Sequence, residues 1–368
     1  MENRRTFLRN SLIATAGTAL SMGTTLKINA MDTPKESNKT KMPLSEKSIL
    51  FMKMIGIKYP IIQAPTGGVV KPSMTIAVAD EGVLGAIPLT WTSPESSFEY
   101  IQTIKKSTKG KFFANFLLQF EPESLDKTLE AGAKIVQFSW GIPSKAIIKK
   151  LRKSNVIMGI QVTSEASALA AIEAGADYLV CQGTEAGGHV HASRPLADAL
   201  VRVLNVAGDV PVAASGGIAT GKDMRKYLEM GASAVVMGTR FVASKECSAH
   251  QEYKSSLVKA KSEDTVFTVC LNKGWSNSTH RILRNNTFEM WEAAGCPPLE
   301  RSPGVDDIVA HYVNGHELSR YSTATPVVGM TGNVKDAAMY AGKGVDNITD
   351  IPSVSDIIER IWNEYLYS

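Results

Sequence analysis

The sequence predicts a (β/α)8 TIM barrel, an α/β fold, with a C-terminal extension of helices and loops. Eight short apolar segments recur between Ile61 and Met237, and helical patterns separate them. Glycine follows directly after several of the helical segments. Alternating strands and helices are typical of a parallel sheet covered by helices, either a closed barrel or an open doubly wound sheet.

The elements follow one another in a regular order. The predicted strands are 61–64, 83–87, 111–117, 134–138, 156–162, 178–182, 210–214 and 234–237. The predicted helices are 73–81, 95–107, 123–131, 143–153, 165–174, 195–206 and 221–230. Gly132, Gly175 and Gly231 each stand just past a helix, where the left-handed conformation of a C-cap favours glycine. Residues 250–368 lack this rhythm, so we expect them to pack on the barrel as helices and loops.

Composition excludes several classes of protein. The chain has 368 residues, of which 44% are hydrophobic and 21% charged, a globular composition. Its formal charge is +4, and four basic residues against Glu2 within residues 1–30 give +3 of it, which leaves +1 for the remainder. That balance predicts no nucleic-acid surface. Beyond the N-terminus no apolar run approaches the roughly 18–20 residues of a membrane span.

The N-terminus has the build of a bacterial export signal. Arg4-Arg5 followed by Phe7-Leu8 resembles a twin-arginine motif, and a mildly apolar segment and the small residue Ala30 follow. We therefore expect a signal peptide over residues 1–30, a linker over 31–47, a barrel domain over 48–368 and a periplasmic location. A basic terminus without a signal function would instead leave the protein in the cytoplasm.

The four cysteines predict no zinc or redox site. None of them forms a C-x-x-C pair, which is the spacing of zinc ribbons and thioredoxin-like sites. Cys181 lies within an apolar run and is predicted to be a buried thiol. No metal site is expected.

Glycine-rich loops after the last two predicted strands indicate a phosphate site. Ser215-Gly216-Gly217 follows one strand and Gly238-Thr239 follows the next. In barrels these two loops commonly bind phosphate, because glycine lets backbone N–H groups approach closely and a helix N-terminus adds a favourable dipole.

A candidate catalytic residue follows the sixth strand. His189 comes directly after Gly187-Gly188, at the catalytic face of a barrel, and imidazole can take a proton near neutral pH. His191 and Glu185 lie in the same loop, and each is either a site residue or a loop residue. The amides that end other strands could hydrogen-bond a heteroaromatic ring or serve only structure; they are Asn115, Gln137 and Gln161.

Together these motifs resemble the nitronate monooxygenase family of flavin enzymes, formerly called 2-nitropropane dioxygenases. The matching segments cover roughly residues 48–362. They are Gln63-Ala64-Pro65 with Gly67-Gly68, 183–189, 214–218, 238–241, 280–285, 291–295 and 340–345.

The resemblance implies an FMN-binding barrel that oxidises nitronates or nitroalkanes with oxygen to carbonyl compounds and nitrite. By carry-over, His189 is the catalytic base. The phosphate of FMN would be held by Ser215, Gly216, Gly217, Gly238 and Thr239. The rest of the cofactor would be lined by Gln161, Gly183 and Gly188, with Ala64 and Gly67 near the flavin ring.

Two departures from the family pattern affect the expected substrate. Val190-His191 stands where the family often has glycine after the histidine, and Lys343 stands where it often has glutamine. Relatives on this fold include NAD(P)H:quinone reductases and flavin-dependent enoyl-ACP reductases, so an FMN-dependent reductase is an alternative. A flavin-binding protein without catalysis and a phosphate-dependent aldolase barrel are further alternatives.

Overall fold

The computed structural model describes residues 42–367. The expected signal peptide and most of the expected linker lie outside the described residues. The first described helix, α2 (Glu46–Ile55), begins within the last two residues assigned to that linker. Ser45 caps it by accepting a hydrogen bond from the Ser48 amide.

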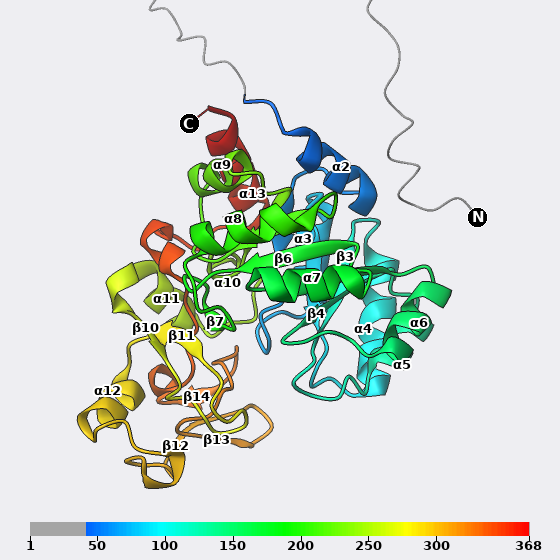
Figure 1. The fold of residues 1–368 in the computed structure, drawn as a ribbon. Coiled ribbons are helices and arrows are strands. Elements are labelled where there is room, and N and C mark those ends of the chain that lie inside the picture. Colours follow the sequence, from blue (N-terminus) through cyan, green and yellow to red (C-terminus); the bar gives the residue numbers. More distant parts are fainter. Residues whose placement is uncertain (1–41, 368) are drawn as a thin grey trace, which may run out of the picture. The chain divides into compact units, whose positions relative to one another are not determined.

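A parallel sheet of eight strands forms the barrel (Figure 1). Its spatial order is β1-β9-β8-β6-β5-β4-β3-β2. The sheet closes between β1 and β2, where the Gln63 amide donates to the Leu84 carbonyl at 2.9 Å and the Leu84 amide to the Ile61 carbonyl at 3.1 Å. The barrel strands are β1 (Ile61–Gln63), β2 (Gly85–Pro88), β3 (Phe112–Leu117), β4 (Ile135–Ser139), β5 (Ile157–Val162), β6 (Tyr178–Gln182), β8 (Val212–Ser215) and β9 (Ala234–Met237).

Helices between the strands occur where the sequence predicts them. They are α3 (Pro72–Asp80), α4 (Pro94–Ser107), α5 (Leu125–Glu130), α6 (Lys145–Lys153), α7 (Glu165–Glu173), α8 (Leu196–Ala207) and α9 (Gly221–Glu229). A short helix, α10 (Thr239–Val242), follows β9. The predicted barrel is confirmed, because the strand order rules out the open doubly wound alternative.

Alternation along the strands divides the core into two parts. Ile62, Phe113 and Tyr178 belong to a cluster inside the barrel, and their neighbours in sequence face the helices. Phe51 of α2 joins the inner cluster, with its ring centroid 5.8 Å from that of Tyr178. Helix α2 therefore closes one end of the barrel, and the carboxyl ends of the strands are left for a site.

The C-terminal extension contains two small antiparallel sheets in addition to the expected helices and loops. One sheet joins β10 (Thr265–Thr268), β11 (His280–Leu283) and β7 (Gly188–His189), and the other joins β12 (Ile308–His311), β13 (Glu317–Ser319) and β14 (Thr331–Gly332). The helical elements are α11 (Gln251–Lys259), η1 (Ser262–Asp264), α12 (Asn286–Ala293), η2 (Leu299–Arg301), η3 (Val334–Asp336), η4 (Lys343–Asn347) and α13 (Val354–Tyr367). Strands of two to four residues show no alternation that a sequence pattern could reveal.

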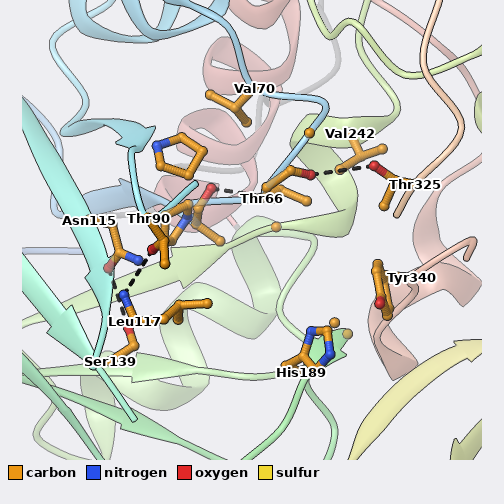
Figure 2. Close-up of a pocket in the computed structure, with 18 of the residues that line it drawn as sticks. Thr66, Val70, Thr90, Asn115, Leu117, Ser139, His189, Val242, Thr325 and Tyr340 are labelled. Carbon is orange, nitrogen blue, oxygen red and sulfur yellow. Dashed lines mark hydrogen bonds between the residues drawn. The ribbon is translucent and has the colours of Figure 1, made fainter. Parts of the chain in front are cut away.

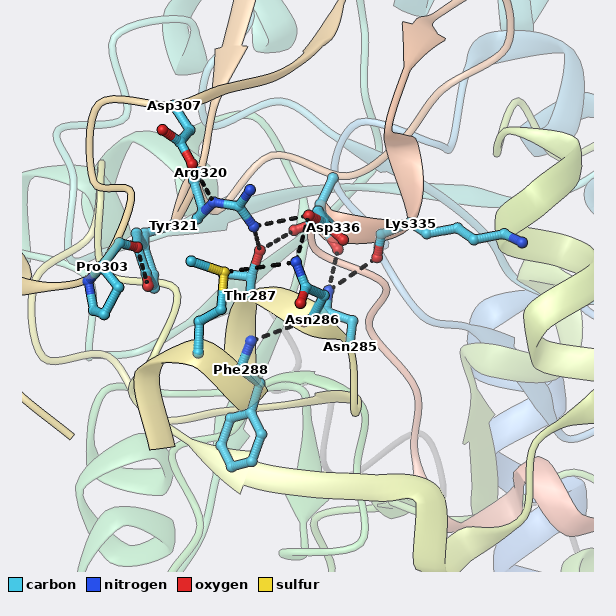
Figure 3. A network of polar contacts seen from close by, with 12 residues as sticks. Asn285, Asn286, Thr287, Phe288, Pro303, Asp307, Arg320, Tyr321, Lys335 and Asp336 are labelled. Carbon is cyan, nitrogen blue, oxygen red and sulfur yellow. Dashed lines mark hydrogen bonds and ion pairs between the residues drawn. The ribbon is translucent and has the colours of Figure 1, made fainter. Parts of the chain in front are cut away.

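A buried ion pair holds the extension together (Figure 3). Arg320 donates to Asp336 at 2.8 Å and to the Thr287 hydroxyl at 3.1 Å, and it also pairs with Asp307 at 3.2 Å. Asn286 donates to the same Asp336 carboxylate at 3.1 Å. The network links α12, η3 and the residue that follows β13.

We expect Arg320→Ala to lower the free energy of unfolding by about 3–5 kcal/mol, because it leaves the Asp336 carboxylate buried without its cation. Urea unfolding followed by circular dichroism measures the loss. Arg284→Ala is the matched control, since its partner Glu292 is exposed and such pairs contribute about 0–1 kcal/mol. Equal losses in the two variants would contradict the assignment.

Candidate active site

A cavity of about 980 Å³ lies at the carboxyl ends of the barrel strands. The loops after the strands line it, together with residues of the C-terminal extension such as Lys273, Thr325 and Tyr340. In Figure 2, His189 and Tyr340 lie on one side of the cavity and Asn115 and Ser139 on the other. This is the end of the barrel at which TIM-barrel enzymes carry their active sites.

The fold gathers all but one of the predicted site residues around this cavity. Those that line it are Ala64, Gly67, Gln161, Gly188, His189, Ser215, Gly216, Gly217, Gly238 and Thr239. Gly183 does not line it. Its amide donates to the Ser215 carbonyl at 2.9 Å, and a Cβ on Gly183 would lie 2.4 Å from the Leu196 backbone. Gly183 therefore allows the start of α8 to pack closely against the loop, a structural task.

The predicted phosphate loop forms a cradle of backbone groups. Gly216 and Gly217 both have positive φ, 137° and 68°, which glycine adopts without strain. Among the described residues, no backbone hydrogen bond is found for either of their amide N–H groups. A Cβ on Gly344 would lie 2.5 Å from the Gly217 carbonyl oxygen, so the C-terminal segment closes the cradle at backbone distance. Free N–H groups in a concave loop suit an anion.

The helix N-terminus expected at this cradle is already occupied. Thr220 and Asp223 form a capping box on α9, and the Asp223 carboxylate accepts from the amides of Ala219 and Thr220, each at 3.0 Å. The Gly221 amide donates to Glu364 at 2.8 Å. Carboxylates of α9 itself and of α13 therefore satisfy the first N–H groups of α9, so these groups do not donate to a ligand.

Two sets of hydrogen bonds fix the backbone of His189. Strand β7 pairs with β11 of the extension, with His189 opposite His280 and Gly188 opposite Arg281. On the barrel side, the Gln182 side chain donates to the His189 carbonyl at 3.2 Å and accepts from the His191 amide at 2.9 Å. Gln182 was missed as a site residue, although its place at the end of the sixth strand was a signal.

The His189 ring is packed among aromatic rings and is poorly hydrated. It stacks on Trp275 with centroids 4.2 Å apart and lies 5.3 Å from the Tyr340 ring. Its Nε2 atom is buried and has no hydrogen-bond partner among the described residues. Burial, assisted by the nearby His280, lowers the pKa of His189 to about 3. The imidazole is therefore neutral at physiological pH, and one nitrogen is left for a ligand.

His280 is held as a neutral structural neighbour. Its Nε2 accepts from the Leu271 amide at 3.2 Å, so Nδ1 carries the proton and donates to the Ser278 carbonyl at 2.9 Å. Burial lowers its pKa to about 4. Trp275 and His280 both come from the extension, at a distance in sequence that no local pattern reveals.

The strand-end amides differ in their availability. Asn115 accepts from Gln137 and from the Ser139 hydroxyl, each at 3.3 Å, and Gln137 in turn accepts from the Tyr178 hydroxyl at 3.2 Å. These two amides form part of a network between strands. Gln161 lines the cavity and has no side-chain hydrogen bond within the described part of the chain. Of the three, Gln161 is the one left for a ligand.

Three residues whose roles were left open lie outside the cavity lining. Glu185 accepts from the Leu196 amide at 2.8 Å and so caps α8. His191 is exposed and stacks on Trp140, with centroids 4.8 Å apart. Lys343 is exposed, and its amide donates to the Glu185 carbonyl, while its neighbours Gly342 and Gly344 reach the cavity.

The charge of the cavity lining is positive. Lys71 and Lys273 line it, and no aspartate or glutamate does within residues 42–367. Over the same residues there is no cluster of three or more potential metal ligands, and no helix is long and apolar enough to cross a bilayer. The cysteines of the described chain are all free thiols, with Cys181 buried as predicted. The cavity can thus hold an anionic group and an organic ligand.

Comparison with known proteins places the chain in a family. The family model for nitronate monooxygenase matches residues 48–128 and 119–364. A nitronate monooxygenase of Pseudomonas aeruginosa is 31% identical over 350 residues, which cover 82% of this chain and 95% of that protein. A probable nitronate monooxygenase of Staphylococcus saprophyticus is 28% identical over 58% of this chain and 74% of its own length.

Solved structures share the fold. FabK from Thermotoga maritima superposes with a TM-score of 0.68 and 26% identity, over 86% of this chain and 95% of that one. A nitroalkane oxidase from Streptomyces ansochromogenes gives a TM-score of 0.67 at 23% identity, over 86% and 97% of the two chains. With the matched family model and the shared barrel, the chain belongs to the nitronate monooxygenase family of flavin-dependent oxidoreductases.

Proposed function

We propose that this enzyme binds FMN and oxidises nitronates with molecular oxygen, giving carbonyl compounds and nitrite. The observation that carries the proposal is a neutral, half-buried His189, with a buried and unpartnered Nε2, in the same cavity as the free N–H groups of Gly216 and Gly217. The family membership and the name of the Pseudomonas aeruginosa relative support the same reaction.

The residues present fit FMN. The cradle of Ser215, Gly216 and Gly217 offers backbone donors to a phosphate, and Gly238 and Thr239 lie on the neighbouring strand end. Gln161 offers a free amide to the ring system. When bound, the flavin would supply the redox chemistry that passes electrons from the substrate to oxygen.

His189 is suited to an anionic substrate. A nitronate is already deprotonated, and its charge is favoured in a cavity whose charged lining consists of Lys71 and Lys273. A buried imidazole with a lowered pKa is a weak base until a negative group approaches and raises that pKa. We infer that His189 contacts a bound nitronate, and that it takes the α-proton of a neutral nitroalkane as negative charge develops on the nitro group.

The first test is the absorbance spectrum of the purified protein, followed by anaerobic mixing with propyl-2-nitronate and, separately, with NADH. We expect a flavin spectrum that the nitronate bleaches and NADH leaves unchanged. Bleaching by NADH alone would assign the reductase alternative. Failure to bind FMN on reconstitution would overturn the proposal.

His189→Asn tests the role of the imidazole. We expect kcat/KM for a neutral nitroalkane to fall by about 10²–10⁴-fold, since a proton acceptor is lost. The fall for the corresponding nitronate should be smaller, and the flavin content should be unchanged. His316→Asn, at an exposed position, is the control and should leave both values as they are. Equal falls for both substrate forms would contradict a role in proton transfer.

The lowered pKa values of His189 and His280 also predict a loss of stability in acid. Their folded pKa values, about 3 for His189 and about 4 for His280, lie below the usual value near 6.5 for an unfolded histidine. As pH falls below about 6.5, the unfolded chain binds protons that the folded chain does not, so the free energy of unfolding decreases. The decrease continues until pH falls below the folded values.

We therefore expect urea unfolding midpoints to fall between pH 7 and pH 5, and to fall less in His189→Asn than in the wild type. His316→Asn should show the same decrease as the wild type, because its side chain is exposed. A decrease in His189→Asn as large as that of the wild type would show that His189 does not titrate in this way.

A further inference from the structure

A group of four aromatic rings in mutual contact lies at the active-site region, and two of them, Trp91 and Trp140, line the cavity. Trp91 follows β2, Phe120 follows β3, Trp140 follows β4, and Trp275 comes from the extension. The Trp275 ring lies 6.5 Å from Trp91, 5.2 Å from Phe120 and 4.7 Å from Trp140. Because Trp275 also stacks on His189, these four rings, here called the aromatic wall, lead from His189 to the rim of the cavity.

Trp91 is largely exposed at the cavity. It lines the cavity, yet it is 62% exposed, which is unusual for so large an apolar side chain. Its contacts with Phe120 and Trp275 are edge contacts at 66° and 67°, and no ring within residues 42–367 stacks on it. The ring stands beside Gly67, where a Cβ would lie at an ordinary contact distance of 3.5 Å from the indole.

Trp140 is held in a strained conformation. Its φ is +63°, a region that bulky residues rarely adopt, and strain of this kind clusters at ligand-binding sites. In this conformation the Trp140 side chain lines the cavity. Its ring is nearly parallel to the His191 ring, with an interplanar angle of 14°. A glycine would form the same turn without strain, but it would supply no ring.

The cavity has room for a second ring beside the cofactor. Its volume of about 980 Å³ is at the upper end of the roughly 300–1,000 Å³ of ligand sites. The phosphate cradle belongs to the loops after β8 and β9, whereas Trp91 and Trp140 belong to the loops after β2 and β4. The two tryptophans therefore stay clear of the phosphate cradle, and Trp91 lies beside Gly67, on the side expected for the flavin ring.

We propose that the aromatic wall is a subsite for a planar aromatic group of the substrate, so that aryl nitronates are preferred over short alkyl nitronates. The inference rests on the proposed function, because it assigns the substrate class of the same cavity. Stacked aromatic pairs gain about 0.5–1.5 kcal/mol beyond their buried area, which corresponds to a preference of roughly 2–12-fold.

A binding experiment tests the subsite independently of turnover. The holoenzyme is titrated with benzoate and with cyclohexanecarboxylate, two carboxylates of similar size and equal charge, and the flavin spectrum reports the Kd. We expect benzoate to bind about 2–12-fold more tightly. Trp91→Ala should abolish the difference, and Trp91→Phe should retain it. Trp291→Ala is the control: Trp291 lies on α12 away from the cavity lining, so the difference should persist.

A kinetic experiment tests whether the same preference appears with nitronate substrates. The ratio of kcat/KM for the nitronate of phenylnitromethane to that for propyl-2-nitronate should fall in Trp91→Ala, mainly through KM, and stay unchanged in Trp291→Ala. Equal Kd values for the two carboxylates, or loss of flavin from Trp91→Ala, would overturn the inference. A benzoate preference without oxidation of any nitronate would uphold the subsite and refute the proposed function.

Discussion

The two-residue pairing of β7 with β11 is the constraint on which the site depends. It joins the loop after β6 to a strand more than 90 residues later, with His189 opposite His280. The buried guanidinium of Arg281 strengthens the junction by donating twice to the Thr184 carbonyl, at 3.1 and 2.9 Å. Because Trp275 arrives on the same extension, one junction sets both the backbone and the ring plane of His189.

The phosphate cradle of Ser215, Gly216 and Gly217 also depends on close packing between backbone segments. Gly187 lies against Gly342, and Gly344 against Gly217, at distances where a Cβ would meet backbone atoms at 2.4 and 2.5 Å. Thr239 adds a hydrogen bond by accepting from the Gly342 amide at 3.0 Å. Three segments that are far apart in the sequence thus meet without side chains between them, and the amides of Gly216 and Gly217, which line the cavity, have no backbone partner among the described residues.

The electrostatics of the site follow from this packing. Excluding water from His189 keeps its imidazole neutral, while the positive lining favours a negative ligand. The same exclusion makes the ring a poor base in the absence of substrate and sensitive to any anion placed against it. The predicted loss of stability in acid thus follows from the lowered pKa values of His189 and His280, whereas the positive lining comes from Lys71 and Lys273.

The sequence by itself determined the barrel and most of its lining. Alternating strands and helices show in local periodicity, and in a barrel every strand ends at the same face, so Gln161, His189, Ser215 and Gly238 had to converge. The adjacent glycines Gly216 and Gly217 likewise predicted the phosphate cradle from the sequence.

Only the tertiary structure determined which residues pack around the cavity lining and support it. The roles of Gly183, Gln182, Trp275 and His280 depend on contacts between distant segments, and strands as short as β7 carry no periodicity of their own. Whether the N-terminus of α9 was free for a phosphate also depended on Glu364, whose carboxylate reaches the Gly221 amide from α13 only in the folded chain. Local patterns determine elements, but long-range packing determines which polar groups remain unpaired and available to a ligand.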